Sequence, residues 1–208
     1  PITDLLVNPA DGAMYIAFGG RRVQSGLYRV TYVGNESTAP AKPVRKGESE
    51  RKARRSLEEH LQGGAKVTSS SELDLIWKFL GSDDRGIRHA ARAALEKQPV
   101  KNWKNRLADE ANPVTSTAAM IALARVDSEG SASEIIAKAT SLDYTKTKSR
   151  QTRLDILRSV TLLLTRGGQP NVSDRAKLIK WLDGIYPART PDENRDLSAM
   201  AAFLKAPF

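Results

Sequence analysis

The stretch AARAAL at residues 90–95 returns as AAMIAL at residues 118–123, so Ala-Ala is followed in both by two residues and then Ala-Leu. Small residues on an inner helix let neighbouring helices approach closely, as stacked helix pairs require. Candidate helices also group as pairs of about 30 to 40 residues, which begin near Ser69, Val100, Ser131 and Asn171. The sequence therefore predicts a mainly α fold, a HEAT-like α-solenoid of helix pairs. The alternative is a compact alanine-rich bundle, because HEAT units usually span ~40 to 47 residues.

Helical patterning continues along the chain after residue 48. Residues 73–80 place Leu, Ile, Trp and Leu at i, i+3, i+4 and i+7, the spacing of a helix with one buried face. Asn112 followed by Pro113 predicts a cap and a proline in the first helical position. Serine or threonine followed three residues later by glutamate predicts a capping box. Such boxes are expected for Ser69 with Glu72, Ser131 with Glu134, and Thr190 with Glu193.

The first 34 residues follow a different pattern. Short apolar and β-branched runs separated by turn residues predict strands over residues 2–7, 13–18 and 26–33, with a break at Gly19-Gly20. The predicted organisation is a short antiparallel β segment over residues 1–34, a linker over 35–47 and a helical repeat region over 48–208. Three strands are too few for a free-standing sheet domain. We therefore expect a fragment of a longer protein, truncated at the C-terminus of its helical region.

The amino-acid composition excludes several kinds of catalytic and metal-binding site in this chain. The chain of 208 residues contains no cysteine, which excludes disulfides, thiolate zinc sites, cysteine nucleophiles and covalent haem c attachment within it. His60 and His89 are its only histidines, and neither has a partner at the spacing of a metal site or a catalytic triad. Asp83-Asp84 and Asp109-Glu110 precede expected helices and are interpreted as helix caps. No catalytic residue, metal ligand or transmembrane segment is predicted.

The net charge of +9 is concentrated in two runs. Residues 42–55 contain seven basic and two acidic residues, and residues 146–166 contain six basic and one acidic residue. A basic face attracts nucleic acid, anionic lipid or an acidic protein through its long-range field. Neither run interleaves aromatic residues that would stack on bases. We therefore interpret the runs as a solvated linker and a polar helix face, and nucleic acid is not the expected partner.

The N-terminal segment resembles the last blade of a β-propeller. The residues that carry the resemblance are NPADGAMY at 8–15, Gly-Gly-Arg at 19–21 and QSGLYRV at 24–30. They are most similar to glucose/sorbosone dehydrogenase-like propellers, found in large exported bacterial proteins of planctomycete and verrucomicrobial type. In that family a HEAT-like helical region and then a c-type cytochrome domain follow the propeller. The order of blade, linker and helices in this chain agrees with the family.

The resemblance implies an exported, periplasmic bacterial protein of the membrane-bound dehydrogenase-like kind. Its parent would be a quinone-dependent sugar or alcohol dehydrogenase that passes electrons to haem. Haem c and pyrroloquinoline quinone would then be cofactors of the parent protein, with none expected in these residues. Arg21, in the matching Gly-Gly-Arg segment, is the one candidate cofactor-binding residue, and a solvated loop arginine is the alternative.

Two functions of the helical array follow from these patterns. In the first, the array is a spacer or protein-docking scaffold between the adjacent propeller and cytochrome domains of an electron-transfer protein. In the second, it is a non-catalytic binding scaffold whose basic face holds a protein or polyanionic partner. Nucleic-acid binding through the array is a third, based on charge alone.

Overall fold

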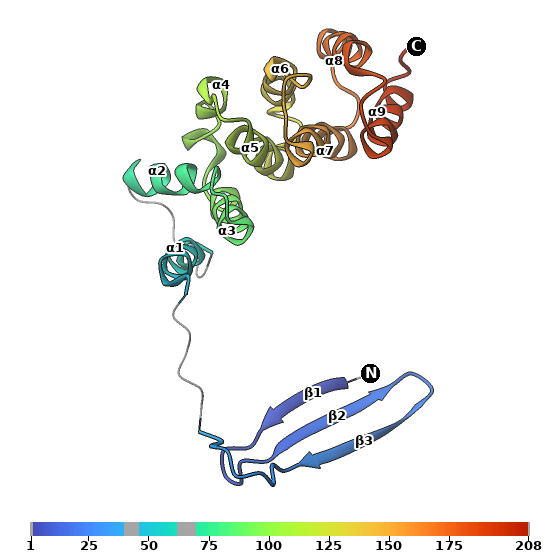
Figure 1. Cartoon of the computed structure of the whole chain (residues 1–208). Helices are drawn as coiled ribbons and strands as arrows, with labels where there is room; N and C mark the ends of the chain where they lie inside the picture. The colour runs from blue at the N-terminus through green and yellow to red at the C-terminus, as the bar shows by residue number, and fades with distance from the viewer. Residues whose placement is uncertain (1, 40–45, 62–69, 208) are drawn as a thin grey trace. The chain divides into compact units, whose positions relative to one another are not determined.

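A computed structural model describes residues 2–39, 46–61 and 70–207. These residues form a three-stranded antiparallel sheet followed by helices (Figure 1). The chain divides into two compact units, a sheet unit (Pro1–Lys46) and a helical unit (Gly47–Phe208). The expectation of a mainly helical chain with a short antiparallel β segment at its N-terminus is confirmed.

The sheet unit is a meander in the order β1-β2-β3. Its strands are β1 (Ile2–Val7), β2 (Met14–Gly20) and β3 (Val23–Val30). The register aligns Leu5 with Ile16 and Ile16 with Tyr28, so these three apolar side chains share one face. The ring of Phe18 stacks on that of Tyr28 on the same face, with centroids 4.9 Å apart. This apolar face is largely exposed, since Leu5 and Tyr28 retain 51% and 59% of their accessible surface.

The second hairpin differs from the sequence expectation. A break was expected at Gly19-Gly20, but both glycines belong to β2, and β3 begins three residues earlier than predicted. Gly20 pairs with Val23, so only Arg21 and Arg22 form the turn, and Arg22 takes the left-handed conformation with φ 65°. Gly19 serves close packing instead, because a Cβ there would lie 2.6 Å from the hydroxyl of Ser25. The prediction was wrong because it assigned the turn to the glycines.

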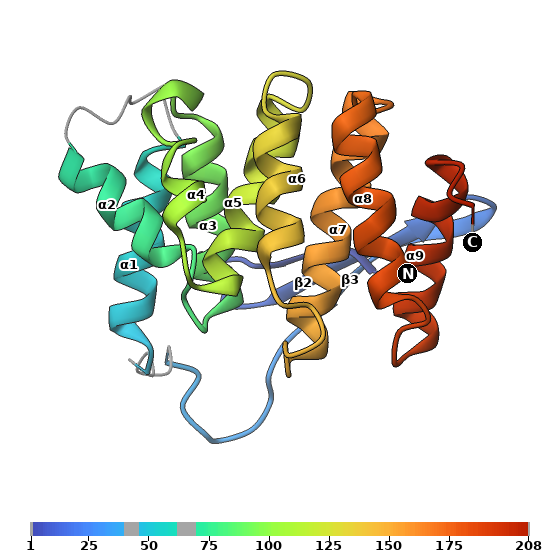
Figure 2. The same ribbon diagram turned by 90° about the horizontal axis from the view of Figure 1, so that it is seen from above.

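The helical unit contains nine α-helices and one 3₁₀ turn within its described residues. They are α1 (Glu48–Glu59), α2 (Ser70–Phe79), α3 (Arg85–Glu96), η1 (Val100–Asn102), α4 (Arg106–Asp109), α5 (Pro113–Val126), α6 (Ala132–Ser141), α7 (Arg150–Gly167), α8 (Val172–Ile185) and α9 (Pro191–Phe203). Helices α3, α5, α7 and α9 follow one another in one row, and α4, α6 and α8 in a second row (Figure 2). Contacts also join the rows, as between α5 and α6 and between α8 and α9.

Local capping explains several helix starts. The side chain of Asn112 accepts a hydrogen bond from the Val114 amide at 2.8 Å, with Pro113 in the first turn of α5, as predicted. The capping box at Ser131 is wrong, because its hydroxyl donates to the Asp127 carboxylate at 2.5 Å and makes no cap bond. Glu134 was the expected partner, whereas the observed partner Asp127 lies four residues before Ser131, outside the capping-box spacing.

The other two expected boxes have different outcomes. Thr190 does cap α9, and its hydroxyl accepts from the Glu193 amide and donates to the Glu193 carboxylate. That carboxylate also binds Arg153, so it serves a tertiary contact as well as the helix start. The box at Ser69 lies outside the described residues.

The core of the helical unit follows the alanine pattern of the sequence. Ala90, Ala91 and Ala94 of α3 and Ala119 and Ala122 of α5 are buried, and the two helices are in contact. Larger side chains fill the space around them, and a fully buried leucine or isoleucine contributes about 1.5–3 kcal/mol to folding. Several of them are completely inaccessible: Leu57, Ile76, Leu95, Trp103, Leu123, Ile136 and Ile156. One continuous hydrophobic cluster therefore extends from α1 to the residues that follow α9.

Candidate functional site

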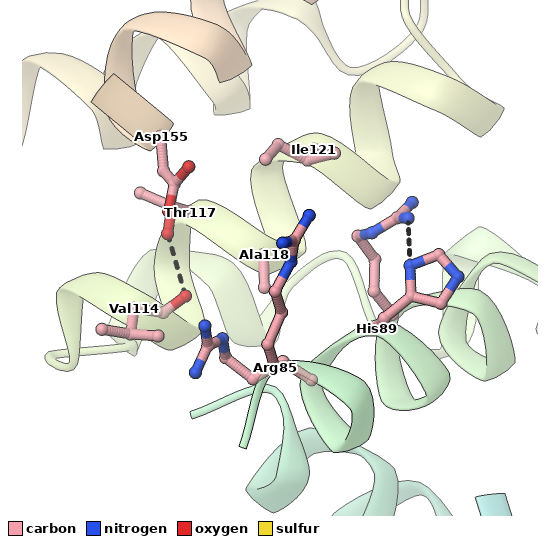
Figure 3. A pocket seen from close by; sticks show the side chains of 9 residues that line it. Arg85, His89, Val114, Thr117, Ala118, Ile121 and Asp155 are labelled. Atoms are coloured by element: carbon pink, nitrogen blue, oxygen red, sulfur yellow. Dashed lines mark hydrogen bonds between the residues drawn. The ribbon is translucent and has the colours of Figure 1, made fainter. Parts of the chain in front are cut away.

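Three arginines of the helical unit lie together on α3. Arg85, Arg88 and Arg92 are spaced i, i+3 and i+7, so they share one face of the helix. The alanines of α3 occupy the opposite, buried face, which directs the arginines away from the core. His89 lies on the same side as the arginines, and Figure 3 shows it with Arg85 beside residues of α5 and α7.

These side chains border a hollow that we call the arginine groove. Three arginines and His89 of α3 form one wall, four residues of α5 form the floor, and Asp155 of α7 stands on the other side. Its volume is about 190 Å³, below the ~300–1,000 Å³ of typical small-molecule sites. The arginine groove therefore has room for a few side chains of a partner, and too little for a nucleotide or quinone.

The arginines differ in how their charge is balanced. Arg92 forms an ion pair with Glu96, and Arg125 of α5 shares that carboxylate at 2.9 Å. Arg88 instead donates through Nη1 to the backbone carbonyls of Ser82 and Asp83, at 2.6 and 2.9 Å.

The positive charges of Arg85 and Arg88 are not balanced by an adjacent carboxylate. Neither guanidinium has a carboxylate within 4.0 Å among the residues that the structure describes. The hydrogen bonds of Arg88 to carbonyls fix its position without neutralising it. The α3 wall of the groove therefore carries at least two positive charges that are free to bind an anion.

The floor of the arginine groove is apolar. Val114, Ala118 and Ile121 follow one another at i, i+4 and i+7 along α5, and all three are half-buried. The remaining floor residue, Thr117, donates its hydroxyl to the Val114 carbonyl at 2.9 Å (Figure 3). Its polar group is therefore satisfied within α5, and the floor offers a partner hydrophobic contact.

Asp155 gives the wall on α7 the opposite charge. Its carboxylate accepts a hydrogen bond from the Gln151 side chain at 2.9 Å. Burial raises the pKa of Asp155, although the hydrogen bond from Gln151 and the positive charges of Arg88 and Arg85 act against this rise. The groove is thus asymmetric, with arginines on the α3 side and one partly desolvated carboxylate on the α7 side.

His89 forms a hydrogen bond with an arginine of its own helix. Its Nδ1 accepts a hydrogen bond from the Arg92 guanidinium at 3.2 Å. No group of His, Cys, Asp and Glu with the geometry of a metal site occurs among the described residues. The groove residues therefore offer a partner charged groups and apolar surface, the two features that bind a protein surface.

The basic residues of the two runs do not line this site, although Asp155 of the second run does. In residues 146–166, three of the six basic residues form ion pairs with carboxylates of other segments: Lys146 with Asp143, Arg150 with Asp192, and Arg153 with Glu193. Residues 42–55 lie partly outside the described residues, and Arg54 pairs with Glu58. Counting charge along contiguous stretches therefore missed the three arginines of α3. Their spacing opposite the buried alanines is the signal that would have found them.

Arg21 belongs to the sheet unit and is not among the residues that line the arginine groove. It occupies the first position of the two-residue turn between β2 and β3, and its side chain is exposed. It forms no ion pair with the described residues. Its predicted role in cofactor binding remains a prediction.

A second, larger hollow of about 650 Å³ lies beside α8 and the residues after α9. Its lining mixes Lys180 and Lys205 with Asp183. Arg175, which also borders it, donates through Nε to the Leu204 carbonyl at 2.9 Å. Like Arg85 and Arg88, the three cations of this hollow have no carboxylate within 4.0 Å among the described residues, so it is a second basic surface of the helical unit.

Comparisons of the chain with protein-family models, with curated proteins and with solved structures gave no match. No helix within the described ranges is both long and apolar enough to span a membrane.

Proposed function

We propose that the helical unit is a HEAT-like α-solenoid that acts as a protein-docking scaffold, with the arginine groove as the surface that holds an acidic partner. The observation that carries this proposal is the wall formed by Arg85 and Arg88, two arginines without a carboxylate partner among the described residues, beside a half-buried apolar floor. Guanidinium groups bind carboxylates with two parallel hydrogen bonds, which suits them to recognition.

The contact pattern supports a solenoid rather than a compact bundle. Contacts link α1 to α3, α3 to α5, α5 to α7 and α7 to α9, so each helix meets the next in its row. Stacked repeats produce this nearest-neighbour order, and they create extended surfaces that bind partners. The matching alanine stretches lie on α3 and α5, two successive members of one row, as a repeat would place them.

We also propose that the sheet unit is one blade of a β-propeller in an exported bacterial dehydrogenase-like protein. Support comes from its exposed apolar face with Leu5, Ile16 and Tyr28, because neighbouring blades of a propeller cover such faces. The helical unit would then dock or space a haem domain relative to the propeller. Haem c and pyrroloquinoline quinone would be held by parts of the parent protein outside this chain.

A titration with an acidic probe tests the docking function. Labelled polyglutamate is added to the full chain at about 50 mM and about 150 mM salt, and its fluorescence anisotropy reports binding. We expect Arg85→Ala/Arg88→Ala to weaken binding at least about fivefold, since each lost ion pair is worth up to ~1 kcal/mol. The control variant Lys101→Ala/Lys180→Ala removes the same charge from exposed positions outside the groove and should bind nearly as the parent chain does.

Two results would contradict the proposal. One is the absence of polyglutamate binding even at the lower salt concentration. The other is an equal loss of affinity in the arginine variant and the lysine variant, which would show that net charge alone attracts the probe.

A further inference from the structure

We infer that the arginine groove accepts an acidic amphipathic helix, whose apolar side rests on α5 and whose carboxylates face α3. This inference rests on the proposed docking function and specifies the partner of the same site. It draws on three features of the groove: the apolar floor, the positions of the two unpaired arginines, and the carboxylate of Asp155.

The floor determines the apolar side of the partner. Val114 and Ile121 are seven residues apart on α5, which separates them by ~10 Å along the helix axis at 1.5 Å per residue. Two turns of a partner helix present apolar side chains at i, i+3, i+4 and i+7 over the same length. A nucleic-acid backbone would place phosphates against this floor and leave its apolar surface without a complementary contact. The floor thus favours a peptide over a polynucleotide.

The α3 wall determines where the partner carries its acidic residues. Arg85 and Arg88 are three residues apart, so their guanidinium groups match carboxylates spaced i and i+3 or i+4 on a facing helix. The carbonyls of Ser82 and Asp83 already hold the Arg88 side chain in place. A pre-ordered arginine loses less conformational entropy when it binds, which strengthens a charge-assisted contact.

Asp155 determines the orientation of the partner. Its carboxylate lies on the α7 side of the floor, where an acidic residue of the partner would be repelled. A lysine or an amide on that side of the helix is tolerated or attracted. The partner is therefore acidic on one flank of its apolar stripe and neutral or basic on the other, and such a helix should bind more tightly than a uniformly acidic segment.

A pair of synthetic peptides tests the inference. Both are about 18 residues long, ~27 Å as a helix, and contain the same Leu, Glu, Ala and Lys residues. In the first peptide, leucines form one stripe with glutamates on one flank and lysine on the other. In the second, the same residues are rearranged so that leucines occur on all sides. Anisotropy titrations of the full chain at about 150 mM salt compare the two peptides.

We expect the first peptide to bind at least about tenfold more tightly, since burial of two or three leucines on the floor contributes more than ~1.4 kcal/mol. Ile121→Ala should weaken its binding about fivefold and leave the second peptide unchanged. The matched control is Ile179→Ala, the same change at a half-buried isoleucine of α8, which should bind both peptides as the parent chain does. Thermal melts confirm that both variants remain folded.

The outcomes separate this inference from the docking function. Equal binding of both peptides, with loss of both in Arg85→Ala/Arg88→Ala, overturns the amphipathic helix and leaves the acidic docking surface intact. Equal binding that survives the loss of both arginines overturns the inference and the docking function together. Displacement of the first peptide by a duplex oligonucleotide at equal charge concentration also overturns the inference, in favour of a polyanion.

Discussion

Nε of Arg153 in α7 lies 2.5 Å from Oε1 of Glu193 in α9, and the exposed fractions of these side chains are 6% and 0%. Arg153 also donates to the Thr147 and Lys148 carbonyls, at 2.8 and 3.0 Å. Burial alone would raise the pKa of Glu193, but Arg153 and the Thr190 hydroxyl more than offset it and hold that pKa below its usual value. This ion pair joins two neighbouring helices of one row and fixes the segment that precedes α7.

Removing one member of this pair should destabilise the chain strongly. Glu193→Leu leaves the Arg153 guanidinium buried without its carboxylate, and we expect a loss of about 3–5 kcal/mol in the free energy of unfolding. Arg153→Met/Glu193→Leu removes both charges and should lose clearly less than the single variant. Urea unfolding followed by circular dichroism measures both values. A single variant within about 1 kcal/mol of the parent chain would contradict the burial of the pair.

Asp155→Asn should stabilise the chain at neutral pH. Burial raises the pKa of Asp155 in the fold above its usual value of 3.8, so the folded chain holds this proton more tightly than the unfolded chain. As pH rises from below 3.8 through the raised pKa, the free energy of unfolding therefore falls, and the asparagine variant escapes this fall. Urea titrations between about pH 3 and pH 7 measure the difference. An advantage of the variant that is the same at both ends of this range would contradict the account.

The two units should be separable at residue 47. A chain that begins at Gly47 should keep the helical melting transition, because the sheet unit and the helical unit are distinct compact bodies. A chain that begins at Ser70 lacks α1, whose Leu57 is fully buried in the helical core, and should melt at a lower temperature. Circular dichroism melts of the three chains compare these cases. Collapse of the transition on removal of the strands alone would show that the sheet is integral to the helical core.

The buried alanines should tolerate little added volume. Ala91→Leu inserts three carbon atoms at a fully buried position of α3, and we expect a loss of about 1–3 kcal/mol. Ala93→Leu makes the same change at a half-buried position of that helix and should cost less. Differential scanning calorimetry measures both. Equal losses would argue against close packing along the alanine face.

Structural features that depend on a few neighbouring residues were predicted best from the sequence. The first strand runs over residues 2–7 as expected, and the cap of α5 follows from Asn112 and Pro113, because those signals act within a few residues. Arg153 was counted within a basic surface run but is buried, because its partner Glu193 lies 40 residues later. The residues near Arg153 in the sequence do not indicate this contact.

The candidate site was missed for the same reason. The arginine groove combines Arg85, Ile121 and Asp155, which meet only after three helices have packed. The spacing of arginines along α3 was visible in the sequence, but the apolar floor and the opposing carboxylate depend on tertiary structure. Pattern analysis can therefore identify one wall of this groove and not the groove itself.

The most direct test of the central claim is to locate a bound acidic peptide on the protein. A ¹⁵N-labelled full chain is titrated with the leucine-striped peptide, and chemical-shift changes are followed for backbone amides and for arginine Nε–Hε groups. The account predicts that the largest changes cluster at Arg85, Arg88 and the amides of residues 114–121. Changes concentrated in residues 46–55, or around the hollow beside α8, would contradict the assignment of the arginine groove as the docking surface.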